Sequence, residues 1–212
     1  MEELDLLKKA WQKDTHSFEQ VSEMEIYKML HRKSSSIVKW ILIISVLEVL
    51  LWTAISVLFN FDADLKKMIG EDLIVYFKVF NYFNYAVIIG FIFLFYKNYI
   101  KISTTASTKQ LMKDILRTRK TVQYYVWYNL GMITVSMFLG FAMSYFYNPD
   151  MSVLKDRIAH ESGYKTLIIT CGFLLLATVL IVGIFWLFYR LLYGILLRKL
   201  NNNYKELKKI DL

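Results

Sequence analysis

The stretch that decides the fold runs from Ile37 to Phe59 and reads IVKWILIISVLEVLLWTAISVLF. Its only charged residues are Lys39, near its start, and Glu48, at its middle. An α-helix rises about 1.5 Å per residue, so about 20 apolar residues cross the roughly 30 Å hydrocarbon core of a bilayer. The stretch therefore predicts a transmembrane helix with a carboxylate near the middle of the membrane.

Three further apolar runs predict spans at about residues 73–96, 122–147 and 165–189. The chain is 56% hydrophobic but also 21% charged, so the charges must lie in blocks between the apolar runs. One proline and eight glycines among 212 residues favour long, uninterrupted helices. The predicted fold class is an all-α integral membrane protein, in which residues 37–197 form an antiparallel bundle of four transmembrane helices.

Residues 1–36 are polar and should form a short helical region in the cytoplasm. Leu4, Leu7 and Trp11 lie at helical spacing among charged residues, which predicts a short amphipathic helix. We expect this helix to dock on its own protein, and the alternative is that it binds a partner or the membrane surface. The first apolar run begins only at residue 37, which predicts an uncleaved anchor rather than a cleaved signal.

A second helix start is marked by Ser22 and Glu25, which have the spacing of a capping box. In such a box each residue bonds to the backbone of the other, which stabilises the first turn. We expect the helix to run on through the serines at 34–36 into the first span.

Basic residues are distributed unequally between the two sides of the predicted bundle. Residues 1–36, 97–120 and 198–212 hold eighteen Lys and Arg, whereas the connectors at 61–72 and 148–164 hold four. Cytoplasmic loops of membrane proteins are enriched in Lys and Arg. This predicts that both termini and the basic loop at 97–120 lie in the cytoplasm, and it accounts for the net charge of +8.

The basic loop itself reads as an amphipathic helix leading into the third span. Such a helix lies along anionic headgroups, which makes the lipid bilayer its expected partner. Binding to nucleic acid is not expected, because the segment carries no recognition motif. After residue 198 we expect Asn201, Asn202 and Asn203 to end the last helix, with a short basic tail beyond them.

Glu48 is the one candidate for an intramembrane site. An ionised carboxylate in lipid costs at least about 2.5 kcal/mol, so it must face the bundle and find a partner. The second span carries Lys78, Asn81 and Asn84, and we expect this polar face to point inward toward Glu48. Glu48 would then be a hydrogen-bonded residue that fixes the order of the helices, and the alternative is a proton or ion site.

Small side chains recur in two rows that could let helices approach closely. The candidate packing residues are Ser136, Gly140 and Ser144 in the third span, and Gly172, Gly183 and Gly194 in the fourth. We expect both rows to pack within the chain. A homodimer seam is the alternative for the row in the third span.

Known catalytic and cofactor motifs are missing from the sequence. His16 and His31 are expected in the cytoplasm and His160 on the outer side, so the three cannot converge on one metal ion. There is no glycine-rich phosphate loop and no nucleophile elbow. No catalytic residue, cofactor or metal is therefore expected, and the single cysteine, Cys171, excludes an intramolecular disulfide.

The first fifty residues carry a family resemblance. The segments LDLLKKAWQK (4–13) and SFEQVSEMEIYKMLHRKSSSIVKWILIISVLE (17–48) resemble a bacterial family of small four-span membrane proteins of unassigned function. Members of that family are often labelled beta-carotene monooxygenase. The resemblance implies a location in the bacterial inner membrane and no established activity.

Two functions remain open from the sequence. The first is a non-catalytic interaction or regulatory module, whose cytoplasmic face binds a protein partner. The second is a small transporter or channel-like assembly that uses Glu48. Four spans enclose little space, so the second function requires an oligomer.

Overall fold

The computed structural model describes residues 22–59, 66, 71–148, 151–159 and 163–210. The candidate partner-binding residues Leu4, Leu7 and Trp11 lie outside these ranges. The described residues are almost entirely helical, as expected. In chain order the helices are α2 (Glu23–Leu58), α4 (Glu71–Thr104), α5 (Thr108–Tyr147), α6 (Ser152–Ala159) and α7 (Gly163–Ile210).

The start of α2 follows from its capping box, as the sequence predicts. The backbone nitrogen of Glu25 donates to Oγ of Ser22 over 3.3 Å, and the backbone nitrogen of Ser22 donates to Oε2 of Glu25 over 3.0 Å. The helix then continues without a break through the three serines into the apolar run. The region after Ser22 and the first span are therefore one continuous helix.

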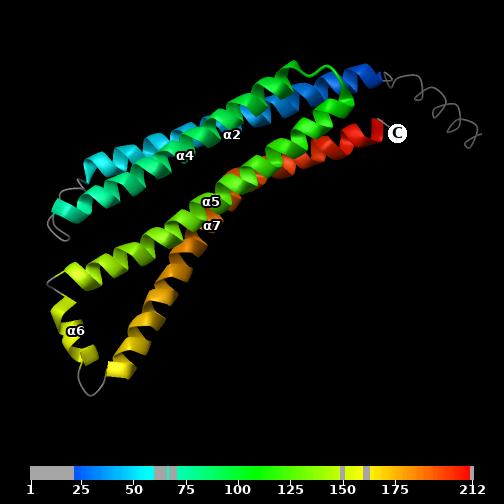
Figure 1. Ribbon diagram of the computed structural model, residues 1–212. Coiled ribbons are helices and arrows are strands. Elements are labelled where there is room, and N and C mark those ends of the chain that lie inside the picture. Colours follow the sequence, from blue (N-terminus) through cyan, green and yellow to red (C-terminus); the bar gives the residue numbers. More distant parts are fainter. Residues whose placement is uncertain (1–21, 60–65, 67–70, 149–150, 160–162, 211–212) are drawn as a thin grey trace, which may run out of the picture.

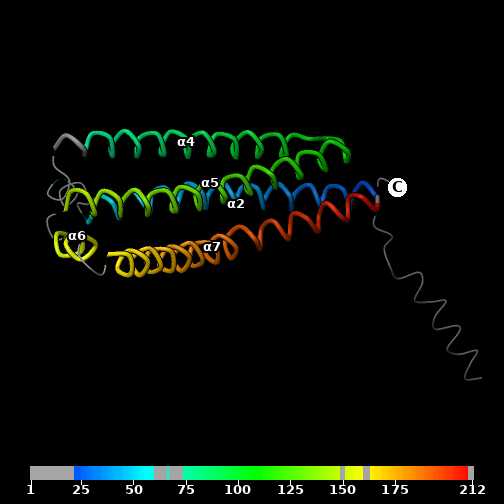
Figure 2. The backbone as a smooth tube through the Cα atoms, turned by 60° about the horizontal axis from the view of Figure 1, so that its bottom comes forward, coloured from blue at the N-terminus to red at the C-terminus, as the bar shows by residue number. Residues whose placement is uncertain are grey.

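The four long helices form an antiparallel bundle (Figures 1 and 2). Each one packs against the two helices that lie beside it: α2 against α4 and α7, and α5 against α4 and α7. Each of these helices also contains a segment long and apolar enough to cross a membrane. The described chain thus has the four candidate spans that the sequence predicts.

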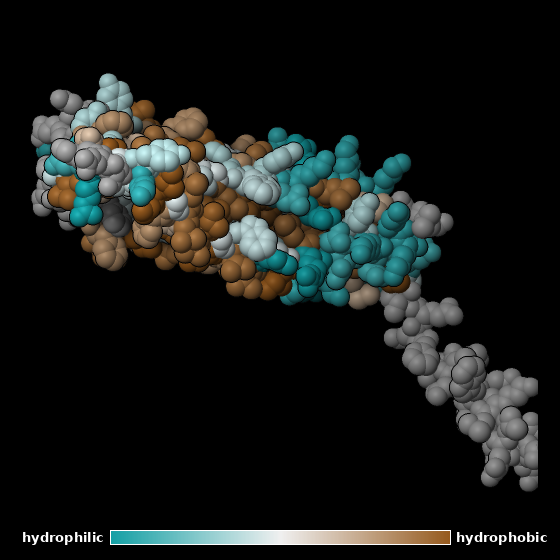
Figure 3. Space-filling model, turned by 90° about the horizontal axis from the view of Figure 1, so that it is seen from below, coloured by the Kyte–Doolittle hydropathy of each residue, from teal (hydrophilic) through white to brown (hydrophobic). Residues whose placement is uncertain are grey.

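All four helices are longer than a bilayer core requires. The 36 residues of α2 and the 48 residues of α7 correspond to about 54 Å and 72 Å, against roughly 30 Å of hydrocarbon. The surplus lies at the end of the bundle that contains residues 23–36, 97–121 and 198–210, which we call the basic end. Figure 3 shows hydrophilic residues gathered at this end and hydrophobic residues along the middle of the bundle.

The basic end has its own hydrophobic core. Side chains from all four long helices are buried there: Leu30, Val38, Ile102, Leu111, Ile115, Leu200 and Leu207. A second buried cluster lies farther along the bundle and is rich in aromatic side chains: Ile41, Ile88, Phe95, Val122, Tyr125, Leu130, Tyr189 and Tyr193. The surplus turns are therefore a packed four-helix unit, not separate loops and tails.

The end of α7 corrects one expectation. The three asparagines at 201–203 do not end the helix, which continues to Ile210. Nδ2 of Asn203 donates to Oγ of Ser34 in α2 over 3.0 Å. Nη1 of Arg119 in α5 donates to Oδ1 of Asn201 over 2.6 Å. Asn201 and Asn203 use their side chains to bind neighbouring helices, so these side chains do not compete with the helical backbone.

The opposite end of the bundle is more open. Figure 1 shows the first half of α7 turning away from α5, with α6 between their ends. The sequence did not predict α6. A Cβ atom at Gly163 would overlap the backbone oxygen of Ile158, so the start of α7 can approach α6 closely only because this residue is glycine.

Candidate functional site

Glu48 lies inside the bundle, where three tyrosines surround its carboxylate. Only 7% of the residue is exposed. The hydroxyl of Tyr189 donates to Oε1 over 2.5 Å. The hydroxyls of Tyr125 and Tyr193 donate to Oε2 over 2.9 Å and 3.1 Å. Three hydroxyl donors on the two oxygens provide the partners that a buried carboxylate requires.

The rings of the three tyrosines also pack against one another. The rings of Tyr189 and Tyr193, one turn apart on α7, stack with centroids 6.1 Å apart. Tyr125 of α5 meets both of them edge-on. Phe91 and Phe95 of α4 meet Tyr125 edge-on in turn, at 5.5 Å and 5.4 Å. All four long helices therefore contribute to this site, which we call the Glu48 cluster.

The partners of Glu48 differ from those that the sequence suggested. We expected a polar side chain of the second span, but α5 and α7 supply the hydroxyls and α4 supplies only aromatic rings. From the sequence alone, Tyr125, Tyr189 and Tyr193 are interpreted as parts of the aromatic belts at the membrane interface. The interpretation failed because a tyrosine at a membrane surface and one bonded to a buried acid look alike in a sequence. The i, i+4 spacing of Tyr189 and Tyr193 is the signal that could have paired them with Glu48.

The polar face of the second span does not point into the bundle as expected. Lys78, Asn81 and Tyr82 are exposed on α4. Only Asn84 is drawn inward, where Oδ1 accepts a 3.0 Å hydrogen bond from the hydroxyl of Tyr128. The expected grouping of Glu48 with Lys78 and Asn81 is therefore absent.

The small residues leave open space instead of close helix contacts. A Cβ atom added at Gly140, Gly172 or Gly183 would have nothing within 4 Å, and one at Gly194 would meet only the side chain of Arg190 in the same helix. Tight packing within the chain at these glycines is therefore not observed. The homodimer seam that includes Ser136, Gly140 and Ser144 stays a prediction.

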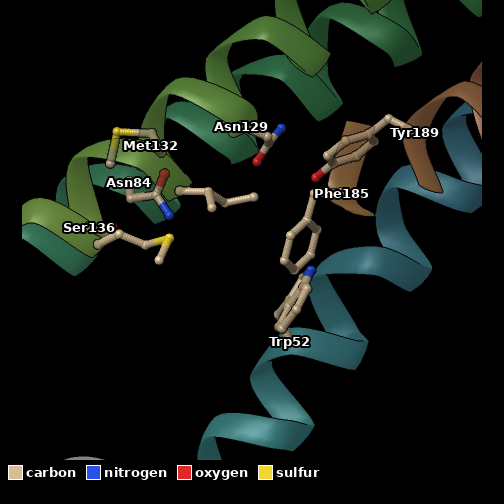
Figure 4. A pocket seen from close by; sticks show the side chains of 9 residues that line it. Trp52, Asn84, Asn129, Met132, Ser136, Phe185 and Tyr189 are labelled. Atoms are coloured by element: carbon tan, nitrogen blue, oxygen red, sulfur yellow. The ribbon is translucent and has the colours of Figure 1, made fainter. Parts of the chain in front are cut away.

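A cavity of about 400 Å³ opens beside the Glu48 cluster. It is lined by side chains from all four long helices, including Trp52, Asn84, Asn129, Ser136, Phe185 and Tyr189 (Figure 4). Tyr189 belongs to both sites, because its hydroxyl binds Glu48 while its ring forms part of the cavity wall. The volume falls within the range of pockets that hold small molecules.

Polar contacts hold the helices together at the basic end. The hydroxyl of Tyr27 in α2 donates to the backbone oxygen of Thr105, in the turn between α4 and α5. The carboxylate of Asp114 is buried and accepts hydrogen bonds from Thr105 and Gln110. Ser107 is the N-cap of α5 and Gln110 follows three residues later, which is the spacing of a capping box, but the side chain of Ser107 makes no capping bond. Gln110 is used to bind Asp114 instead.

The basic end carries a strong positive charge. Residues 23–36, 97–121 and 198–210 contain fifteen Lys and Arg against four Asp and Glu. One of the four acids, Asp114, is buried. The charged surface of this end is therefore overwhelmingly basic, and it can attract an acidic surface or anionic headgroups.

The part of the chain that the structure describes contains no candidate metal-binding cluster. Within it, no group of three or more His, Cys, Asp or Glu side chains could hold a metal ion. Both carboxylate oxygens of Glu48 already accept hydrogen bonds from tyrosine hydroxyls. The arrangement fits a structural polar cluster or a site for a single proton.

Comparisons with known proteins give a family but no activity. No curated protein and no solved structure matches the chain. A family model described as a domain of unknown function, DUF8845, matches residues 24–212, which is nearly all of the described bundle. The chain therefore belongs to the DUF8845 family.

Proposed function

We propose that this protein is an integral inner-membrane protein and a non-catalytic interaction or regulatory module. Its basic end would lie in the cytoplasm and bind an acidic protein partner. The observation that carries the proposal is the packed extension of all four helices beyond the length that a membrane requires. A protein that needed only to span the membrane would not need this second core.

The charge of the basic end supports the same proposal. Basic residues beside the membrane bind anionic headgroups, but the extension carries them well beyond the apolar part of the bundle. Lys28, Lys113 and Lys205 are exposed on α2, α5 and α7. Together they provide a basic surface on a rigid support, which is suited to electrostatic steering of an acidic partner. Residues 1–21, with Leu4, Leu7 and Trp11, would add an apolar contact to this face.

The test places a photoreactive amino acid at Lys113 or Lys205 in the full chain, expressed in its native membrane. We expect a discrete protein adduct at both positions. Phe173, an exposed residue of the apolar part of α7, is the matched control and should give none. Reversing the charge with Lys28→Glu and an added Lys205→Glu should remove the adduct formed at Lys113.

Two outcomes would contradict the proposal. One is that adducts form only with lipid. The other is that charge reversal leaves the protein adduct unchanged. An adduct between two copies of this chain would instead identify the basic end as a homo-oligomer interface, and would replace the acidic partner in the proposal.

A second candidate function is a proton or ion site at Glu48, used by a small oligomeric transporter. The observation that favours it is the hydrogen bond between Glu48 and Tyr189, because Tyr189 also lines an open cavity. Proton flux into proteoliposomes decides between the two functions. Glu48→Gln should abolish a flux if Glu48 carries protons, whereas the structural role predicts no flux in either protein.

A further inference from the structure

Two asparagines that line the cavity each have one side-chain amide atom without a hydrogen bond among the described contacts. Among the described contacts, the nitrogen Nδ2 of Asn84 makes no hydrogen bond, because its bond to Tyr128 is made through Oδ1. The oxygen Oδ1 of Asn129 makes none either, because Nδ2 donates to the backbone oxygen of Tyr125 over 2.8 Å. Since a backbone oxygen can only accept, that bond fixes the orientation of Asn129.

The two free amide ends form a donor and acceptor pair. Figure 4 shows the amide of Asn84 and the oxygen of Asn129 turned toward the space between them. Around them the walls are apolar. The lining includes the rings of Trp52 and Phe185, whose centroids lie 5.7 Å apart, and the side chains of Met132 and Ile133. Lipid chains could fill such a space, but they could not satisfy either amide.

The cavity has no charged lining residue among those that the structure describes. The nearest carboxylate, Glu48, already accepts three hydroxyl bonds. A charged ligand would therefore lose its hydration without gaining an ion pair. A neutral hydroxyl group suits the site better, because one hydroxyl can accept a hydrogen bond from an amide nitrogen and donate one to an amide oxygen.

We propose that this cavity binds a neutral, lipid-soluble alcohol, with its hydroxyl between Asn84 and Asn129 and its apolar body against Trp52 and Phe185. The size of the cavity and the open end of the bundle suit a ligand that enters from the bilayer. Ser136 contributes by being small, since a larger residue would fill the space. The proposal goes beyond the proposed partner binding and does not depend on it.

The experiment uses two photoreactive probes with the full chain in lipid vesicles. One is a sixteen-carbon alcohol with a diazirine near its hydroxyl, and the other is its methyl ether. The ether can still accept a bond from Asn84 but cannot donate to Asn129. Losing one hydrogen bond corresponds to about a fivefold difference in affinity. We therefore expect the alcohol to label the segment from Met132 to Met137 about fivefold more than the ether does.

Variants identify the site. Asn129→Leu should remove the preference for the alcohol. Thr134→Val, on the same helix, should keep it, because Thr134 donates to the backbone of Leu130 and is not among the residues that line this cavity. Ser136→Phe should reduce labelling by both probes while keeping both asparagines. This variant decides the matter if Asn129→Leu fails to fold. The proposal would be overturned by equal labelling with the alcohol and the ether. It would also be overturned if the preference for the alcohol persisted in Asn129→Leu, or if labelling persisted in Ser136→Phe.

Discussion

Replacing Glu48 with leucine should loosen the bundle, because three buried hydroxyls would lose their acceptor. Interhelical hydrogen bonds in membrane proteins contribute about 0.6 kcal/mol each on average and about 1.7 kcal/mol at most. Three such bonds correspond to about 2 kcal/mol, with about 5 kcal/mol as the upper limit. Glu48→Leu also removes a buried charge, which acts in the opposite direction.

Glu48→Gln separates these two effects. It removes the charge as leucine does, but it keeps a carbonyl acceptor and adds an amide that can donate to a tyrosine oxygen. The difference between the two variants therefore reports the hydrogen bonds without a contribution from the charge. We expect the leucine variant to be less stable than the glutamine variant by about 1–2 kcal/mol, measured by equilibrium unfolding in mixed micelles with circular dichroism.

A double-mutant cycle tests the same reasoning from the tyrosine side. Tyr125→Phe should destabilise the wild-type protein by about 0.6 kcal/mol and have almost no effect when Glu48 is leucine. Tyr124→Phe is the matched control, because Tyr124 is 66% exposed and is not one of the three tyrosines that bind Glu48, so it should be neutral in both backgrounds. If Glu48→Leu is as stable as Glu48→Gln, or if Tyr125→Phe costs the same in both backgrounds, the Glu48 cluster does not stabilise the bundle.

Three further predictions concern other parts of the chain. Ser22→Ala should weaken the first turn of α2 by about 1 kcal/mol, which would be measured as faster hydrogen exchange over Met24–Leu30, whereas the control Ser36→Ala should leave that exchange unchanged. Equal exchange in the two variants would exclude a role for the capping box. Leu111→Ala, at a buried position of the basic-end core, should cost about 2–5 kcal/mol in thermal unfolding, and a loss no greater than that of the partly exposed control Leu116→Ala would refute a packed extension. In a Cys171→Ser background, a membrane-impermeant thiol reagent applied to intact cells should label Val153→Cys and spare Ala106→Cys, and the reverse pattern would overturn the predicted orientation.

The helices themselves could be predicted from local rules. Apolar runs of the right length gave four long helices, and the spacing of Ser22 and Glu25 gave the start of α2. Both signals depend on residues that are close in the sequence. The same rules failed at Asn201 and Asn203, because an asparagine normally weakens a helix by bonding to its own backbone. Here Arg119 and Ser34 occupy those side chains, and neither residue is close in the sequence.

The candidate site was only half predictable for a related reason. Glu48 stands out because a carboxylate in an apolar run must be satisfied. Its partners do not stand out, because tyrosine is equally at home at an interface and beside a buried acid. The polar residues of the second span were misleading, since polarity alone does not say which way a helix is rotated. Rotation is set by packing, and the packing of α4 places Phe91 and Phe95 inward and Lys78 outward.

The position of the Glu48 cluster explains why a costly carboxylate belongs there. Apolar contacts between helices are weakly specific in a membrane, because lipid competes for the same surfaces. One half of the bundle, the α2 and α4 hairpin, must still meet the α5 and α7 hairpin in one register. Bonds from Tyr125, Tyr189 and Tyr193 to the same carboxylate satisfy that requirement, since a shift of α2 by one turn would break all three bonds. The cluster also lies between the cavity and the basic end, so a ligand that moves Tyr189 acts on the residue that aligns α2 with α7.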